Sequence, residues 1–189
     1  MKVKYFDLKN KRVFITGGGS GIGASIVEHF CEQECEVYFV DINIKESKKL
    51  ISHLKKKKIK APNFIECNLL KIKKLENIIK KIIKSKGPID ILINNAANDD
   101  RHSTKQVDEK YWNNRMDVNL KHFFFTIKAV LRGMIQKKGG AIINLSSVSW
   151  MLGEGDKVAY ETAKSAVIGL TRSFAREFGK YNIRCNSVT

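Results

Sequence analysis

Tyr160 and Lys164 are the residues whose types and spacing point most directly to proton chemistry. They lie four positions apart, so a helix presents both side chains on one face. A free tyrosine titrates near pH ~10 and an effective base near ~7, a difference of ~4 kcal/mol. One ammonium group at ~4 Å, in surroundings with an effective dielectric of ~20, supplies about that much. The pair therefore predicts that Lys164 lowers the pKa of Tyr160, which then acts as a general base.

Two serines strengthen this interpretation, because the Tyr–Lys spacing alone is common in a lysine-rich chain and recurs at Tyr5 and Lys9. Ser146 and Ser147 follow the apolar run 141–145, which we expect to be a strand. A hydroxyl at the carboxyl edge of a parallel sheet lies where substrates bind. Standing alone, the serines indicate an ordinary turn. Beside the Tyr–Lys pair, they predict a group that holds the reacting oxygen.

A glycine-rich turn follows the first predicted strand, with Gly17, Gly21 and Gly23 at the start of a helical stretch. Glycines at these positions let the backbone turn sharply and approach a diphosphate closely. The free N–H groups and the positive dipole end of the helix then face that diphosphate. Because a strand precedes the turn and another follows the helix, the segment predicts a nucleotide site rather than a purely structural turn.

Asp41 ends the second predicted strand, about 20 residues beyond the glycines. In that position a carboxylate accepts hydrogen bonds from the ribose hydroxyls of an adenosine and repels a 2′-phosphate. The sequence therefore predicts NAD as the cofactor, with NADP disfavoured. Lys45 lies close enough to weaken that preference, and in the alternative interpretation Asp41 only caps the next helix.

Short apolar runs alternate with helical stretches along the whole chain. The runs are rich in β-branched residues, and the stretches carry apolar residues at helical spacing. This alternation predicts an α/β fold, a doubly wound parallel sheet (Rossmann fold) of about six strands with helices on both faces. Its crossovers are right-handed, and its ligand site lies outside the carboxyl ends of the strands. The predicted strands cover 13–16, 36–40, 63–65, 89–93, 141–145 and 183–188, and the predicted helices cover 21–33, a stretch from 45, 70–86, 111–137 and 159–180.

Composition is typical of a globular protein. The chain has 189 residues, 43% of them hydrophobic, enough for one domain over residues 1–189 with its own core. No apolar run approaches the ~20 residues of a membrane span, and the first residues hold no apolar signal core. The four cysteines form no CxxC pair and have no histidines at metal-ligand spacing beside them. We therefore expect buried, reduced thiols in a cytoplasmic protein, with no metal and no membrane partner.

Positive charge is concentrated between residues 45 and 86. The chain has 35 Lys and Arg against 19 Asp and Glu, a net charge of +16. Fifteen lysines and three acidic residues in that stretch account for +12 of it. We interpret these lysines as the solvated faces of two helices, because recognition of bases and phosphates favours arginine. Attraction of an acidic partner or of nucleic acid is the alternative.

Taken together, these motifs resemble the short-chain dehydrogenase/reductase family. The order and spacing agree from residue 11 to residue 189, and the resemblance is carried by 16–23, Asn94-Asn95-Ala96-Ala97, Asn119, Ser147, Tyr160 and Lys164. It implies that Tyr160 is the general base and that Lys164 lowers its pKa and binds the nicotinamide ribose. It also implies that Ser147 stabilises the substrate oxygen and that Asn119 holds a water in the proton relay.

The same resemblance implies a set of cofactor-binding residues along the carboxyl edge of the sheet. Asn94 and Ala96 are expected beside the cofactor, next to the fourth strand. Asn68 stands where the family usually has an aspartate, and its amide oxygen can still accept from the adenine amine. The full set is Gly17, Gly19, Ser20, Gly21, Ile22, Gly23, Asp41, Asn68, Leu69, Asn95, Ala96, Tyr160 and Lys164.

A narrower likeness concerns the segments 94–102, 147–150 and 160–164, which resemble bacterial aldose dehydrogenases of the family. Those that act on D-xylose are nearest, with L-arabinose-type enzymes close to them. This likeness implies oxidation of the anomeric hydroxyl of a pyranose to a lactone. The implied substrate contacts are Asn98, Ser147, Trp150 and Tyr160. Trp150 is alternatively a packed anchor of its loop.

Members of the family continue beyond the point that corresponds to residue 189. We therefore expect the domain to be incomplete at its C-terminus, without the last strand and the substrate-covering region. Members are commonly tetramers, and we expect a homo-oligomer through the helices at 111–137 and 159–180. Three alternatives stay open: another reductase such as a 3-oxoacyl-carrier-protein reductase, an inactive nucleotide-binding fragment, and nucleic-acid binding, which rests on charge alone.

Overall fold

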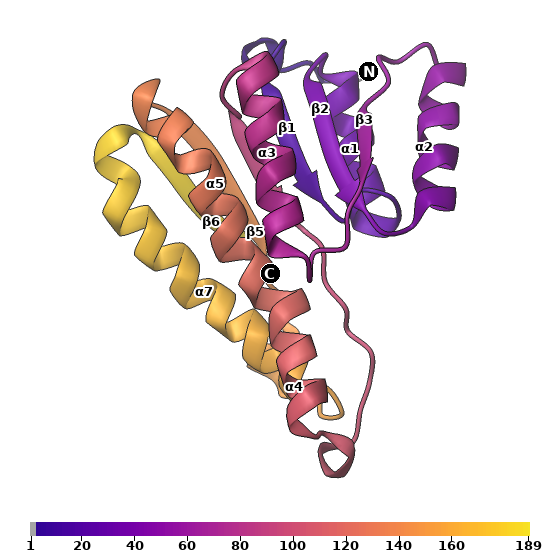
Figure 1. Cartoon of the computed structure of the whole chain (residues 1–189), viewed down its shortest axis with the longest axis vertical. Helices are drawn as coiled ribbons and strands as arrows, with labels where there is room; N and C mark the ends of the chain where they lie inside the picture. The colour runs from indigo at the N-terminus through magenta and orange to yellow at the C-terminus, as the bar shows by residue number, and fades with distance from the viewer. Residues whose placement is uncertain (1–2) are drawn as a thin grey trace.

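The computed structural model describes residues 3–189, and in that part of the chain six parallel strands form one sheet in the order β3-β2-β1-β4-β5-β6 (Figure 1). The strand order reverses at β1, which pairs with β2 on one side and with β4 on the other. The predicted doubly wound sheet is confirmed. Its strands are β1 (Arg12–Thr16), β2 (Glu36–Asp41), β3 (Asn63–Glu66), β4 (Ile91–Asn94), β5 (Gly140–Leu145) and β6 (Ile183–Val188).

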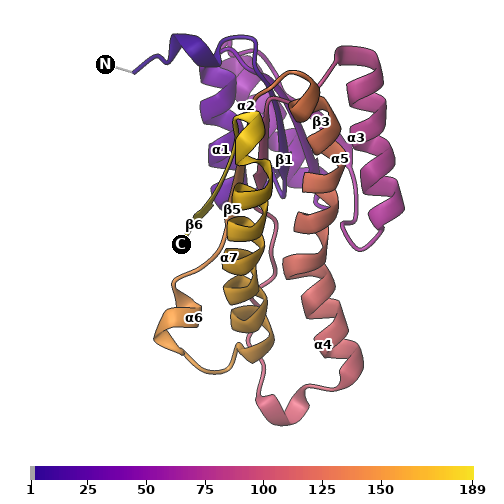
Figure 2. The ribbon, with the colours of Figure 1, turned by 90° about the vertical axis from the view of Figure 1, so that its left-hand side faces the viewer.

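Helices cover both faces of the sheet (Figures 1 and 2). Alternate side chains of a strand point to opposite faces, so each strand supplies both layers of core. Val13 and Ile15 of β1 pack with one helical layer, and Phe14 between them packs with the other, all three fully buried. The first layer is α1 (Gly21–Glu32) and α2 (Ile44–Lys56), and the second is α3 (Ile72–Lys86), α5 (His122–Gln136) and α7 (Val158–Phe178).

The helix predicted over 111–137 is interrupted. It consists of α4 (Glu109–Met116), a π-helical segment (Asp117–Lys121) and α5. The wider π turn accompanies a side chain turned inward: Asn119 is fully buried and binds the backbone of Asn98. In Figure 1, α4 and the start of α7 extend beyond the carboxyl edge of the sheet, next to the loop that follows β4.

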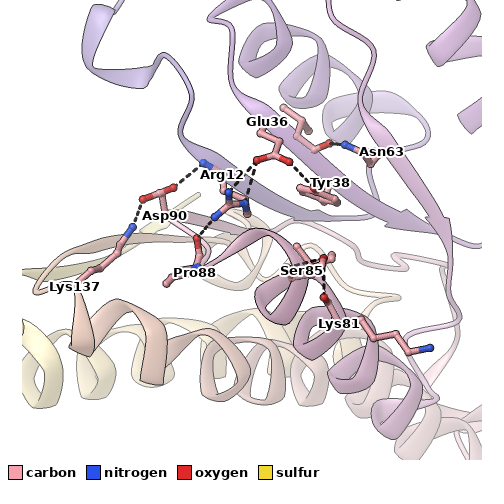
Figure 3. Close-up of polar contacts among 11 residues, drawn as sticks. Arg12, Glu36, Tyr38, Asn63, Lys81, Ser85, Pro88, Asp90 and Lys137 are labelled. Carbon is pink, nitrogen blue, oxygen red and sulfur yellow. Dashed lines mark hydrogen bonds and ion pairs between the residues drawn. The ribbon is translucent and has the colours of Figure 1, made fainter.

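A polar network ties the strands together at the opposite, amino edge of the sheet (Figure 3). The backbone N–H of Arg12 donates to the carboxylate of Asp90 at 2.7 Å, and its guanidinium donates to the carbonyl of Pro88 at 2.8 Å. The same guanidinium pairs with Glu36 at 3.1 Å, and Lys137 pairs with Asp90. These contacts join β1, β2 and the end of α5, and they hold the sheet at the edge away from the glycine turn.

The lysine-rich stretch is a solvated surface, as predicted, although Lys57, Lys58, Lys60 and Lys71 lie just outside helices α2 and α3. All fifteen lysines between 45 and 86 are exposed, whereas Leu54, Leu75 and Ile79 on the inner faces of α2 and α3 are fully buried. The four cysteines are free and buried, which confirms the prediction of buried, reduced thiols. In the described part of the chain, every helix is too short or too polar to cross a lipid bilayer.

Candidate active site

A cavity of about 560 Å³ opens at the carboxyl ends of β1, β2, β4 and β5, where the strand order reverses. The doubly wound topology places a ligand site at this point. The cavity brings together most of the predicted site residues from all parts of the chain. Those that line it are Gly17, Ser20, Gly21, Ile22, Gly23, Asp41, Asn68, Leu69, Asn95, Ala96, Asn98, Tyr160 and Lys164.

The glycine turn forms one wall of this cavity. Gly17 has a φ of +67°, a conformation that favours glycine, and its N–H donates to the carbonyl of Val40 at 2.8 Å. A methyl group on Gly23 would collide with the carbonyl oxygen of Gly17 and lie 2.6 Å from the amide nitrogen of Asn95. Ser20 is the N-cap of α1, but its side chain makes no capping bond. The first N–H groups of α1 therefore lack a capping side chain at a cavity wall, which fits a diphosphate.

Thr16, at the end of β1, fastens the glycine turn to the segment after β4. Its hydroxyl accepts from the backbone N–H of Asn95 at 3.0 Å and from that of Ala96 at 3.2 Å. In return, the side chain of Asn95 donates to the carbonyls of Thr16 and Gly17 at 3.1 and 2.9 Å. This clamp joins two walls of the cavity, and the sequence analysis did not identify Thr16 as part of it.

Asp41 also serves the glycine turn. One carboxylate oxygen accepts from the backbone N–H of Gly19 and the other from that of Asn43, both at 2.8 Å. Asn43 is the residue that caps α2, accepting from the N–H of Glu46 at 3.1 Å. The alternative that Asp41 itself caps this helix is wrong. Gly19 does not line the cavity, but its bond to Asp41 holds the glycine turn, whose other residues line the cavity.

Tyr160 and Lys164 project from the first turns of α7 into the cavity. Lys164 is 1% exposed, its ammonium donates to the carbonyl of Leu145 at 2.6 Å, and it lies 5.6 Å from the ring centroid of Tyr160. Burial lowers the pKa of Lys164 to about 8, and the carboxylate of Asp99 opposes this shift. Burial also raises the pKa of Tyr160, and a hydrogen bond with Ser147 opposes it.

The predicted lowering of the Tyr160 pKa is therefore absent from this geometry. The cost of burying a phenolate outweighs the stabilisation that its neighbours supply. Lys164 contributes little to that stabilisation, because its ammonium is directed to a backbone carbonyl. What the structure does bring together is a tyrosine, a buried lysine and a serine hydroxyl bonded to the tyrosine.

Three other predicted residues, Ser147, Asn119 and Trp150, are not among the residues that line the cavity. The hydroxyl of Ser147 contacts that of Ser149 at 2.8 Å besides its bond with Tyr160. The side chain of Asn119 accepts from the N–H of Asn98 at 2.7 Å and donates to its carbonyl at 3.0 Å. Trp150, on the short α6 (Ser149–Leu152), is not among the lining residues, and its ring nitrogen is buried.

The side chain of Asn94 is fully buried and turned away from the cavity. Its amide donates to Asn144 at 2.9 Å, and its oxygen accepts from the hydroxyl of Thr126 at 2.7 Å. The expectation that Asn94 lies along a cofactor is therefore wrong for its side chain, which links β4, β5 and α5.

Asp99, which was not predicted, is an exposed acidic residue that lines the cavity and acts electrostatically on both Tyr160 and Lys164. Its position beside Asn98 was the available signal. Ser146 was predicted, with Ser147, as a group that holds the reacting oxygen. It lines the cavity, but its hydroxyl donates to the backbone carbonyl of Lys164 at 2.7 Å. The remaining lining residues that were not predicted are Val40, Ile42, Cys67, Ala97, Val118 and Leu145.

A buried histidine beneath the site makes stability depend on pH. His122 is fully buried, its Nε2 lies 3.5 Å from the hydroxyl of Thr16, and burial together with Lys164 lowers its pKa from 6.5 to about 3. The unfolded chain takes up a proton near pH ~6.5, and the folded chain does not. Stability from this group is therefore complete above pH ~6.5 and is lost as the pH falls towards ~3.

We expect the free energy of unfolding to fall by about 2 kcal/mol between pH ~7 and pH ~5 through His122 alone. Denaturant titration at the two pH values measures this loss. His122→Leu removes the titrating group, so the free energy of unfolding of this variant should fall by about 2 kcal/mol less over the same pH interval. An equal loss in both proteins would contradict the assignment.

Comparison with known proteins finds similarity along the same region. The family model described as short chain dehydrogenase matches residues 11–189. D-xylose 1-dehydrogenase of Caulobacter vibrioides is 45% identical over 184 residues, which cover 97% of this chain and 72% of that protein. A probable galactose dehydrogenase of Rhizobium meliloti is 40% identical over 182 residues, covering 96% and 71%. The solved aldohexose dehydrogenase of Thermoplasma acidophilum, in ligand-free form, has a TM-score of 0.85 and 30% identity, covering 97% and 67%.

Proposed function

The chain belongs to the short-chain dehydrogenase family, and from this premise we propose that it oxidises the anomeric hydroxyl of an aldose to the lactone with NAD. Members of this family are oxidoreductases that bind a nicotinamide cofactor. One observation carries the proposal: the glycine turn, Asp41 and the Tyr160–Lys164 pair line a single cavity. Two relatives support a sugar as the substrate: a D-xylose dehydrogenase at 45% identity and a probable galactose dehydrogenase at 40% identity.

The cofactor fits the cavity through groups that this chain already orients. The first turn of α1, without a capping side chain, would hold the diphosphate, and Asp41 would accept from the adenosine ribose. Asn68 and Leu69 would lie beside the adenine, and Lys164 would hold the nicotinamide ribose. When bound, the nicotinamide ring supplies the acceptor for the hydride that leaves C1 of the sugar.

The chain's own residues manage the proton and the substrate oxygen. Tyr160 would take the proton of the C1 hydroxyl, and the hydrogen bond from Ser147 favours the phenolate that this role requires. Ser147 would also hold the substrate oxygen beside Tyr160. Asn119 would fix the segment at Asn98 through its two backbone bonds and hold a water of the proton relay. The carbonyl left at C1 is that of the lactone.

Asp41 provides a test of cofactor choice. Asp41→Asn keeps a side-chain oxygen for the N–H of Gly19 but removes the negative charge that repels a 2′-phosphate. We expect kcat/KM with NAD to fall ~10-fold and activity with NADP to rise, since a charged hydrogen bond contributes ~1.5–3 kcal/mol. Steady-state kinetics with both cofactors measure the change. Unchanged discrimination in the variant would show that the preference lies elsewhere.

The substrate is tested with the purified chain and a panel of free aldoses, including D-xylose, L-arabinose, D-glucose and D-galactose. We expect NADH to form with at least one pentose or hexose and the lactone to appear in equal amount. Reduction of NAD by other alcohols but by none of the sugars would overturn the choice of aldose and leave the oxidoreductase class intact.

A second candidate is favoured by the basic surface. The fifteen exposed lysines of 45–86 would attract an acidic carrier protein, and a 3-oxoacyl-carrier-protein reductase of Staphylococcus epidermidis is 33% identical over 183 residues. That reaction should run on an acyl-carrier substrate and weaken steeply with salt. An absence of turnover with such a substrate at low salt excludes it.

Self-association through α5 and α7 is part of the proposal. Phe124 on α5 is 42% exposed, and its ring lies tilted against that of Phe174 on α7, with ring centroids 5.8 Å apart. An exposed ring of one long helix, resting on a buried ring of the other, suits a helix-to-helix contact between copies of the chain. Light scattering on the purified protein determines the number of copies.

A further inference from the structure

The helix that carries Tyr160 has no cap within its own sequence. Lys157 occupies the N-cap position of α7, and its side chain makes no capping bond but pairs with Glu154. A helix leaves its first N–H groups without partners inside the helix, and a capping acceptor stabilises the helix by satisfying one of them. The N–H of Ala159, one residue before Tyr160, is one of these groups.

A side chain from a distant part of the chain supplies the missing acceptor. Nε2 of His102 accepts from the N–H of Ala159 at 3.3 Å, although 57 residues separate the two. The backbone N–H of His102 donates to the carbonyl of Asp156 at 2.7 Å, just before the helix begins. His102 is 7% exposed, so both contacts are shielded from water. This one residue thus holds the turn that enters α7 and the first turn of α7 itself.

The surroundings of His102 select one form of its ring. Nδ1 lies 3.1 Å from the carbonyl oxygen of Asp100 and 2.9 Å from the hydroxyl of Tyr111. A carbonyl only accepts, so Nδ1 must carry the proton. In the neutral ring Nε2 is then free to accept from Ala159. Tyr111, on α4, is itself held by the ring of His102 and by the guanidinium of Arg115, 4.8 Å from its centroid.

We propose that His102 is a positioning residue of the active site: its neutral ring caps α7 and thereby holds Tyr160 at the substrate. The inference rests on the proposed function in one respect, the role of Tyr160 as the base. Without the cap, the first turn of α7 loosens and the phenol moves away from Ser147. A displacement of ~1 Å in a reacting group costs about 10²-fold in rate. Cofactor binding should change little, because the glycine turn and Asp41 lie on the other wall of the cavity and Lys164 lies beyond the first turn of α7.

Three variants separate this role from a merely structural one. His102→Phe keeps the ring and removes both nitrogens, and His102→Asn keeps a donor towards Asp100 but does not reach Ala159. His102→Gln keeps an acceptor at the length of Nε2. The matched control is His53→Phe, because His53 lies on the outer face of α2 and 53% of its side chain is exposed. Each protein is measured for turnover, for NADH binding by fluorescence, and for amide hydrogen exchange at 158–160.

We expect kcat to fall ~10–100-fold in His102→Phe and His102→Asn, and to recover to within a few-fold in His102→Gln. NADH affinity should stay within ~3-fold in all of them, and exchange at 158–160 should be ~10-fold faster only in the first two. If His102→Phe does not fold, the comparison of Asn with Gln decides the question. Unchanged exchange in the Asn variant overturns the proposal, as does faster exchange with undiminished kcat.

The two proposals fail in different ways. A wild-type chain that oxidises no aldose or other alcohol overturns the proposed function, whatever the variants do. The exchange measurement needs no substrate, so it still establishes whether His102 caps α7. If the enzyme is active and neither kcat nor exchange responds to His102, only the positioning role is overturned.

Discussion

Tyr160→Phe is expected to lower kcat by ~10²–10⁴-fold, the range that a positioned general base contributes. The change removes one oxygen and leaves the ring, which lines the cavity 5.6 Å from the ammonium of Lys164. It also removes the partner of the Ser147 hydroxyl, which then has only Ser149. Because the phenol does not contact the glycine turn, NADH should bind as tightly as in the wild type. Initial rates with the preferred aldose, together with fluorescence titration of NADH, measure the two effects.

The matched control is Tyr5→Phe. Tyr5 also precedes a lysine by four positions, but it is 58% exposed and lies before β1. Its loss should leave kcat within ~2-fold, as expected for a surface change. If Tyr160→Phe retained more than about a tenth of the wild-type kcat, the proton would have to leave by another route, and the role given to Tyr160 would be wrong.

Gly23→Ala is expected to abolish tight cofactor binding, with NADH affinity reduced ~100-fold or more and the fold destabilised by ~1–3 kcal/mol. The added methyl collides with the carbonyl of Gly17 and presses on the side chain of Asn95 at 2.6 Å. Both groups belong to the clamp that joins the glycine turn to the segment after β4. The turn must therefore open, and the first N–H groups of α1 shift from the cavity.

Gly169→Ala supplies the comparison, because Gly169 lies inside α7 and a methyl there meets no atom within 4 Å. Alanine favours helix over glycine by up to ~1 kcal/mol, so this variant should be as stable as the wild type or more so. Calorimetric titration with NADH and thermal unfolding measure both proteins. Wild-type affinity in Gly23→Ala would show that the glycine turn does not approach the cofactor.

Much of the fold could be predicted because its signals are local. The apolar run of β1 and the glycines after it define a strand and a turn within a dozen residues, and burial of Val13, Phe14 and Ile15 follows from the run itself. Helix boundaries agree to within a few residues for the same reason. The resemblance to the family implied most of the cavity residues, and they gather in one place because the carboxyl ends of parallel strands share one edge.

Other features depend on contacts between residues far apart in the chain, which periodicity does not encode. The bond of Asp41 to Gly19 spans 22 positions, and that of Asn119 to Asn98 spans 21 and accompanies the break between α4 and α5. The burial that raises the pKa of Tyr160, and the carbonyl that engages Lys164, exist only after β5 and α7 have packed together.

The amino-acid sequence by itself determined the class of this protein: a doubly wound sheet, a glycine turn for a nucleotide, and a tyrosine and lysine one helical turn apart. Tertiary structure alone decided how these groups are held, since a hydrogen bond needs two atoms within about 3 Å. The contact of His102 with Ala159 is the clearest case, because only the packed loop after β4 brings that imidazole to the start of α7. Residue types and spacing thus predict which chemistry is present, and packing decides its geometry and its electrostatics.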